Sequence, residues 1–118
     1  MNHHAPIKPE ISLSELKQLD IRVGTIVAVA EIPDSATLVR LTVDFGDHKR
    51  NILAGLKKER SNPKAIEGMQ SLFVVNLQPR VMMGETSEGM LFDIGYEDGI
   101  TPVLAIPEHP VPNGTRVG

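Results

Sequence analysis

The chain has 118 residues, of which 41% are apolar and 23% are charged, and it contains no cysteine. This length and composition predict one ordinary globular domain with its own core, and the missing cysteines exclude disulfides and thiolate metal sites. No stretch of about 18–20 apolar residues predicts a membrane span and no secretory signal is visible, so we expect a cytoplasmic protein.

The net charge of −3 is distributed unevenly along the chain. Between residues 49 and 64 six cations stand against one acid, which gives a local charge of +5 and leaves −8 for the remainder. Such segregation predicts one positive face on an acidic molecule, although lysines scattered on a solvated loop would give the same pattern. The cations are Lys49, Arg50, Lys57, Lys58, Arg60 and Lys64.

Residues 1–11 contain two prolines and little periodicity, which predicts an N-terminal arm ahead of a domain covering residues 12–118. The pair Ser12 and Glu15 has the spacing of a capping box and predicts the start of a short helix. Leu13, Leu16 and Leu19 would lie near one face of that helix, which we expect to end before residue 20.

From residue 21 the apolar pattern changes to a period of two, which predicts strands. Residues 21–32 form a long β-rich run, and Gly24 inside it indicates a sharp bend or a close backbone approach. Residues 39–45 alternate between apolar and polar side chains, as expected of a half-buried strand. The dipeptide Gly46-Asp47 predicts a hairpin turn into a third strand at about residues 50–54.

The polar segment 55–68 follows, in which Asn62, Pro63 and Gly68 predict a short connecting helix. Three further strands are expected at residues 71–77, at residues 88–94 after a turn at 84–87, and at residues 103–106. Five or so short strands with a helical connection after the third predict an all-β OB-fold, a five-stranded Greek-key barrel with a short N-terminal helix. Strand number alone would also fit a β-sandwich.

The sequence offers little support for catalysis. None of the four histidines has metal-ligand spacing to another ligand, and no nucleophile elbow, P-loop or dinucleotide-binding motif occurs. We therefore predict a non-enzymatic protein with no catalytic residue, no metal site and no cofactor.

The unusual segment is 76–91, which holds three of the five methionines. Methionine is adaptable and suits a surface that must mould to a partner. Arg80 follows Pro79 and would present its guanidinium from a restricted backbone to a phosphate, a base edge or a carboxylate. The alternative is that Met82 or Met83 fills the core and that Arg80 is an ordinary surface cation.

The run Asn76-Leu77-x-Pro79-Arg80-x-Met82-x-Gly84-x-x-Ser87-x-Gly89-Met90-Leu91 resembles the signature of the tRNA-binding-domain family. Segments 20–27, 41–46, 52–56 and 110–118 resemble other parts of the family in the same order. The family includes stand-alone dimeric tRNA-binding proteins, C-terminal domains of methionyl-tRNA synthetases, cytokine-like synthetase cofactors and CsaA-type export chaperones.

The resemblance implies an OB barrel that forms a homodimer through its N- and C-terminal segments. It places on the ligand-binding face Asn76, Arg80, Met82, Ser87 and Met90. Electrostatic attraction of RNA would come from Lys49, Arg50, Lys57, Lys58 and Arg60. The chain departs from the family pattern at Thr37, Val81 and Met83, where basic residues are common.

Two functions follow from these observations. The first is shape-selective binding of RNA, most of all tRNA, by a homodimer. The second is a CsaA-type chaperone that binds unfolded or export-bound polypeptides, favoured by the acidic net charge and the apolar triplet Val81-Met82-Met83. A third arrangement, docking on an aminoacyl-tRNA synthetase, is compatible with either.

Overall fold

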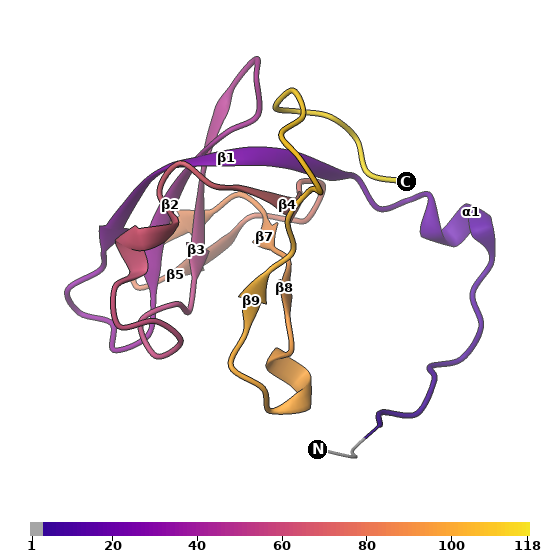
Figure 1. Cartoon of the computed structure of the whole chain (residues 1–118), viewed down its shortest axis with the longest axis horizontal. Coiled ribbons are helices and arrows are strands. Elements are labelled where there is room, and N and C mark those ends of the chain that lie inside the picture. The colour runs from indigo at the N-terminus through magenta and orange to yellow at the C-terminus, as the bar shows by residue number, and fades with distance from the viewer. Residues whose placement is uncertain (1–3) are drawn as a thin grey trace.

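The computed structural model describes residues 4–118, and one long strand organises its architecture (Figure 1). Strand β1 (Ile21–Glu31) pairs antiparallel with β4 (Gln70–Val74) through its first half and with β2 (Val39–Asp44) through its second half. The register shifts between Ile26 and Ala28, and such a bulge bends a strand and increases its twist. One bent strand therefore serves two sides of a barrel.

The remaining strands complete a five-stranded antiparallel sheet in the order β3-β2-β1-β4-β7. Strand β3 (Lys49–Ala54) and strand β7 (Met90–Leu91) are its two edges. The sheet nearly closes on itself, because the Glu88 amide just before β7 donates to the Asn51 carbonyl of β3 at 2.9 Å. The expected OB-type barrel is confirmed.

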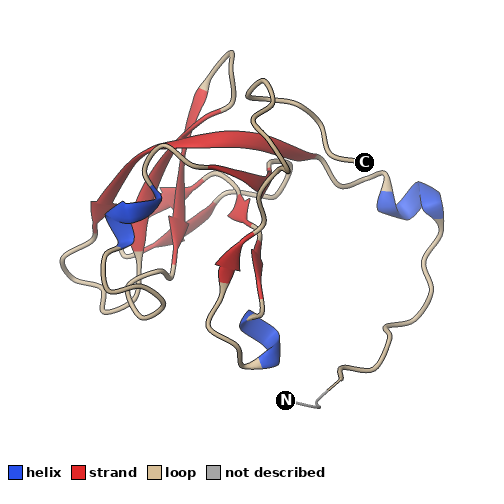
Figure 2. Ribbon diagram, in the orientation of Figure 1, coloured by secondary structure: helices blue, strands red, loops and turns tan. Residues whose placement is uncertain are grey.

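Short elements decorate this barrel, and Figure 2 shows that the helices lie outside the strands. The helices are α1 (Leu13–Leu16), η1 (Pro63–Ile66) and η2 (Tyr96–Asp98). Two small hairpins add four strands: β5 (Arg80–Met82) with β6 (Glu85–Ser87), and β8 (Asp93–Ile94) with β9 (Val103–Leu104).

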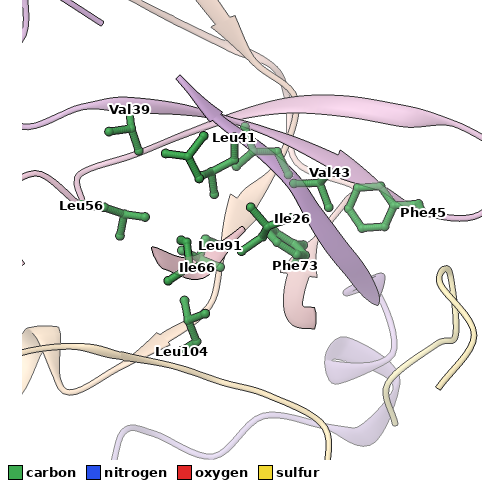
Figure 3. Packing of buried hydrophobic residues seen from close by; sticks show 12 residues of the cluster. Ile26, Val39, Leu41, Val43, Phe45, Leu56, Ile66, Phe73, Leu91 and Leu104 are labelled. Carbon is green, nitrogen blue, oxygen red and sulfur yellow. The ribbon is translucent and has the colours of Figure 1, made fainter. Parts of the chain in front are cut away.

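The barrel interior is filled by alternating side chains of the central strands (Figure 3). Ile26, Leu41 and Phe73 are completely buried, and each fully buried side chain of this size stabilises the fold by about 1.5–3 kcal/mol. Ile66 of η1 and Leu104 of β9 belong to the same cluster. The connecting helix and the β8–β9 hairpin are thus anchored to the core by one large side chain each.

Several sequence-based expectations are confirmed. Ser12 caps α1, with both hydrogen bonds of the capping box to Glu15 present. Gly24 lies at a close approach, because a Cβ there would be 2.5 Å from Val43 Cγ1. Asn62 caps η1, which is a 3₁₀ helix.

The predictions for residues 71–106 were partly wrong. The strand predicted to reach residue 77 ends at Val74. The Val75 amide still donates to the Asp20 carbonyl at 2.8 Å, but the Asp20 amide donates to the Asn76 side chain, which ends the backbone ladder. The strand predicted at 88–94 is divided between β7 and β8, which lie in different sheets. Residues 85–87 are not a turn but strand β6. The last strand ends at Leu104 rather than at residue 106.

The segment before β1 leaves the barrel and turns outward (Figure 1). Residues 4–11 are exposed and have no regular structure, while the first three residues of the expected arm lie outside the described part. The predicted apolar face of α1 does not pack on the barrel, since Leu13 is 65% and Leu16 50% exposed. Among residues 4–118 no helix is long and apolar enough to cross a membrane.

Candidate functional site

The β5–β6 hairpin forms one wall of the candidate site. Met82 pairs with Glu85, so the connecting turn consists of Met83 and Gly84, with φ angles of 53° and 76°. Positive φ at both positions is the geometry of a type I′ turn, which matches the twist of the flanking strands. An ion pair of 2.8 Å between Arg40 on β2 and Glu85 ties the hairpin to the barrel.

A groove of about 570 Å³ runs between this hairpin and the chain that leaves β4. Leu77 and Met90, 44% and 43% exposed, contribute apolar surface to it. Arg80 stands at the start of β5, and its Nη2 lies 3.7 Å from the Met82 sulfur. The groove therefore combines apolar surface with a guanidinium that has no carboxylate partner among residues 4–118. Its lining residues are Asn76, Leu77, Gln78, Pro79, Arg80, Ser87, Gly89 and Met90.

Two of the site residues expected from the sequence are engaged in the fold itself. The Asn76 amide group accepts from the Asp20 amide at 2.8 Å and donates to the Gln18 carbonyl at 2.6 Å. The Ser87 hydroxyl is buried, accepts from the Leu53 amide at 2.9 Å and donates to the Gly89 carbonyl at 3.1 Å. Both side chains shape the groove by fixing its backbone.

The basic residues of segment 49–64 do not form one continuous face. Lys49 and Arg50 begin β3, whereas Lys57, Lys58 and Arg60 follow its other end. The Lys57 ammonium donates to the Ile32 and Ser35 carbonyls at 2.9 and 2.7 Å. Arg60 pairs with Glu59 at 3.4 Å, and both side chains are largely buried. Lys49, Lys58 and Lys64 remain exposed.

Arg50 is also turned inward. Its Nη1 donates to the Val75 carbonyl at 2.7 Å and to the Glu88 carbonyl at 3.1 Å, so it bridges the two chain segments on either side of the groove. Donation of this half-buried guanidinium to backbone carbonyls satisfies both partners, and Arg50 is no longer one of the fully exposed cations.

The two methionines of the hairpin lie outside the core. Neither Met82 nor Met83 belongs to the core cluster, and Met83 is 52% exposed on the hairpin turn. Val81 is 73% exposed. The positions at which basic residues were expected therefore present apolar side chains to the surface.

Sequence reasoning missed Arg40 and the apolar role of Leu77. Arg40 occupies an outward position of an alternating strand, where an arginine resembles any solvated residue, and its partner Glu85 lies 45 residues away. Leu77 was assigned to a buried strand because it continues the apolar run 72–75. Leu77 is exposed because β4 already ends at Val74.

The other charged cluster lies where β1 begins. Asp20 accepts from Arg22 through both carboxylate oxygens, at 2.6 and 3.1 Å, and this hydrogen bonding lowers the pKa of the Asp20 carboxyl. Arg116 of the C-terminal segment pairs with Arg22 through an isolated β-bridge. Among residues 4–118 no group of three or more acidic or histidine side chains is arranged to hold a metal ion.

Comparison with known proteins gives consistent matches. Residues 21–116 match the family described as "Putative tRNA binding domain". Over 110 residues the chain is 36% identical to a methionine–tRNA ligase of Archaeoglobus fulgidus, a match that covers 93% of this chain and 16% of the ligase. The chain thus spans only a small part of that relative's length.

Two solved structures resemble the whole domain. A protein related to methionyl-tRNA synthetase from Pyrococcus horikoshii has a TM-score of 0.86 and 32% identity, with 94% of this chain and 100% of that chain covered. The chaperone CsaA from Bacillus anthracis has a TM-score of 0.80 and 32% identity, with 93% and 100% covered.

Proposed function

Because this chain belongs to the tRNA-binding-domain family, we propose that it binds folded RNA, above all tRNA, without catalysing a reaction. The observation that carries the proposal is the groove beside the β5–β6 hairpin, whose lining combines Arg80 with the exposed Leu77 and Met90 side chains. A cation next to apolar surface suits a nucleotide, whose phosphate is charged and whose base has an apolar face. The cytoplasm, where tRNA is abundant, would be its compartment.

Side chains in and around the groove have distinct roles in this proposal. Arg80 contacts a phosphate or a base edge, while Met82 and Met90 pack against a base or sugar. Lys49 and Lys58 add long-range attraction from the surface. Recognition depends on RNA shape, since the described surface offers few aromatic side chains on which bases could stack.

The test is a titration of total tRNA with the wild-type protein and the variants Arg80→Ala and Lys64→Ala. Lys64 is an exposed cation on η1 that lines no part of the groove. Loss of a groove contact worth about 1–3 kcal/mol lowers affinity roughly 5–150-fold, whereas loss of one remote charge lowers it only slightly. Equal effects of the two substitutions, or no tRNA binding at low salt, would refute the proposal.

A homodimer is the second part of the proposal. The arm and α1 expose Ile7 at 98%, Leu13 at 65% and Leu16 at 50%, and the β8–β9 hairpin exposes Tyr96 at 71% and Ile94 at 56%. Exposed apolar groups on this scale are typical of interaction surfaces. A second copy of the chain exposes the same apolar side chains, so two copies can cover them against each other without any other partner.

Light scattering coupled to size exclusion measures this assembly directly. We expect twice the monomer mass for the wild type and a shift toward monomer for the double variant Leu13→Lys, Leu16→Lys. These two side chains make no contribution to the barrel core, so the variant should keep its far-UV circular dichroism. A wild-type protein that is monomeric at micromolar concentration would contradict this part.

Peptide binding is a second candidate function, favoured by the exposed Val81 and Met83. Apolar side chains at these positions give the hairpin an adaptable surface for an unfolded polypeptide. A competition experiment shows whether the two ligands share the hairpin. If an unfolded peptide displaces tRNA and binds more weakly to Val81→Ser, the hairpin binds both. A peptide that binds with unchanged affinity to Val81→Ser does not use the hairpin.

A further inference from the structure

One side chain bridges the two walls of the groove directly. Arg50 Nη1 donates to the Val75 and Glu88 carbonyls at 2.7 and 3.1 Å. Val75 immediately precedes Asn76, and Glu88 immediately precedes Gly89, so the two carbonyls mark the places where both walls of the groove begin. Arg50 thereby adds a side-chain link between the two walls just beyond the end of the β4–β7 pairing, whose last pair is Val74 and Met90.

The orientation of Arg50 depends in turn on a histidine. Its Nε donates to His48 Nε2 at 3.0 Å. A guanidinium can only donate, so His48 Nε2 must accept and must carry no proton. The other ring nitrogen, Nδ1, lies 2.6 Å from Asp47 Oδ1 and carries the proton of the neutral ring. The ring is also stacked on Phe45, with centroids 5.6 Å apart and planes inclined by 26°.

We propose that Arg50 is a positioning residue of the groove and that neutral His48 keeps it in place, so that the chain Asp47–His48–Arg50 makes ligand binding sensitive to acid. This inference rests on the proposed function for its RNA measurement, but its structural part concerns the protein alone. When His48 Nε2 carries a proton, it faces Arg50 Nε at 3.0 Å as a second N–H donor, and neither atom can accept a hydrogen bond. Arg50 then withdraws, and both carbonyls lose their donor.

The charges around the ring come from four segments of the chain. Asp47 belongs to the same turn as His48, and the pKa of its carboxyl is lowered by the His48 hydrogen bond. Lys49 and Arg50 lie on β3, and Arg50 Nε is 3.0 Å from the ring. Beyond this immediate contact, Asp20 and Arg22 at the start of β1 form an ion pair of 2.6 Å, and Arg116 of the C-terminal segment is bridged to Arg22. The balance leaves His48 between one adjacent carboxylate and one adjacent guanidinium.

The expected effect of acid on RNA affinity has the opposite sign to the effect of added positive charge alone. Histidines as a class gain charge between about pH 8 and pH 5, and added positive charge normally strengthens RNA binding. Here acid releases Arg50 and loosens the groove, so affinity falls. A fall in RNA affinity in acid therefore indicates positioning by Arg50, whereas a rise indicates general electrostatic attraction.

The experiment titrates total tRNA at pH 7.5 and 5.5 with the wild-type protein, His48→Gln and His109→Gln. Glutamine can place an oxygen near the position of Nε2 and cannot gain a proton in this range. We expect the wild type and His109→Gln to lose about tenfold in affinity in acid, the effect of one charged hydrogen bond, and His48→Gln to lose little. Equal losses in wild type and His48→Gln, or tighter binding of the wild type in acid, would overturn the proposal.

A second comparison, at neutral pH, isolates Arg50. Arg50→Lys keeps the charge but cannot reach His48 and both carbonyls at once, because an ammonium lacks the planar fork. We expect Arg50→Lys to bind tRNA about tenfold more weakly, and Lys49→Gln, which removes a charge from the neighbouring exposed position, to lower affinity less and to reduce its salt dependence. Wild-type affinity in Arg50→Lys would overturn the positioning role.

Nuclear magnetic resonance separates this inference from the proposed function. The backbone amides of Asn76 and Gly89 should shift with the titration of the His48 ring in the wild type and stay constant in His48→Gln. If the protein binds no tRNA but these amides follow His48, the proposed function fails and the positioning chain stands. If the amides do not follow His48, the positioning chain falls, whatever the protein binds.

Discussion

Replacing Ser87 by alanine distinguishes a ligand contact from a structural one. The family resemblance places Ser87 on the ligand-binding face, yet the residue is 3% exposed and its hydroxyl joins the Leu53 amide to the Gly89 carbonyl. Ser87→Ala removes both hydrogen bonds without adding volume. We expect the variant to be less stable and, once folded, to bind RNA nearly as well as the wild type.

The magnitude follows from the burial of the partner that is left behind. Leu53 is 6% exposed, so water cannot readily replace the lost acceptor of its amide. A buried donor without a partner costs about 1–3 kcal/mol, out of a total stability of about 5–15 kcal/mol for a domain. For a chain of this size each kcal/mol lowers Tm by about 3–5 °C.

Urea and thermal unfolding followed by far-UV circular dichroism suit this protein, because it has no tryptophan and one tyrosine. Thr86→Ala is the matched control: it removes a hydroxyl from the exposed neighbour on the same short strand and should cost less than about 1 kcal/mol. If Ser87→Ala were as stable as Thr86→Ala while tRNA affinity fell tenfold or more, Ser87 would be a ligand contact and the structural reasoning would be refuted.

Three further predictions concern the barrel and its charges. Gly24→Ala should cost about 1–3 kcal/mol in urea unfolding, because its Cβ would lie 2.5 Å from a core methyl group, whereas Gly55→Ala, with no atom within 4 Å, should be neutral. Burial raises the pKa of the Glu59 carboxyl, so ionisation weakens the fold as pH rises above its ordinary value of 4.5. Glu59→Gln should therefore raise Tm at pH 7 but not at pH 3.5. The lowered pKa of Asp20 has the opposite sign: its pairing with Arg22 stabilises the fold above pH 3.8 and is lost as pH falls further, so a Tm profile of Asp20→Asn should be flatter than that of wild type in acid.

The barrel could be predicted from the sequence because its central strands carry long alternating patterns. The run 39–45 and the glycine at position 24 are local signals, and the structure confirms both. The region 75–94 was harder, since its strands have two or three residues, too few for a period to be recognised. Met83 adds to the difficulty, because a methionine with a φ of 53° is uncommon.

The basic segment shows why charge along the chain does not give charge in space. Its sequence composition indicated a positive face, but Arg50 and Lys57 donate to backbone carbonyls 22–38 residues away. A sequence does not show which backbone carbonyl accepts a hydrogen bond, since every residue has one. The same argument applies to Asn76, whose partners Gln18 and Asp20 lie more than 50 residues earlier.

The β5–β6 hairpin has a consequence for how this protein can evolve. It is a separate two-stranded sheet, tied to the barrel by the Arg40–Glu85 ion pair and by Ser87, and its outward side chains take no part in the core. Val81 and Met83 can therefore be exchanged for lysine, serine or larger apolar residues at little cost in folding. The outward surface of the hairpin and the stability of the barrel depend on different residues, so a lineage can change the surface beside the groove while its barrel stays the same.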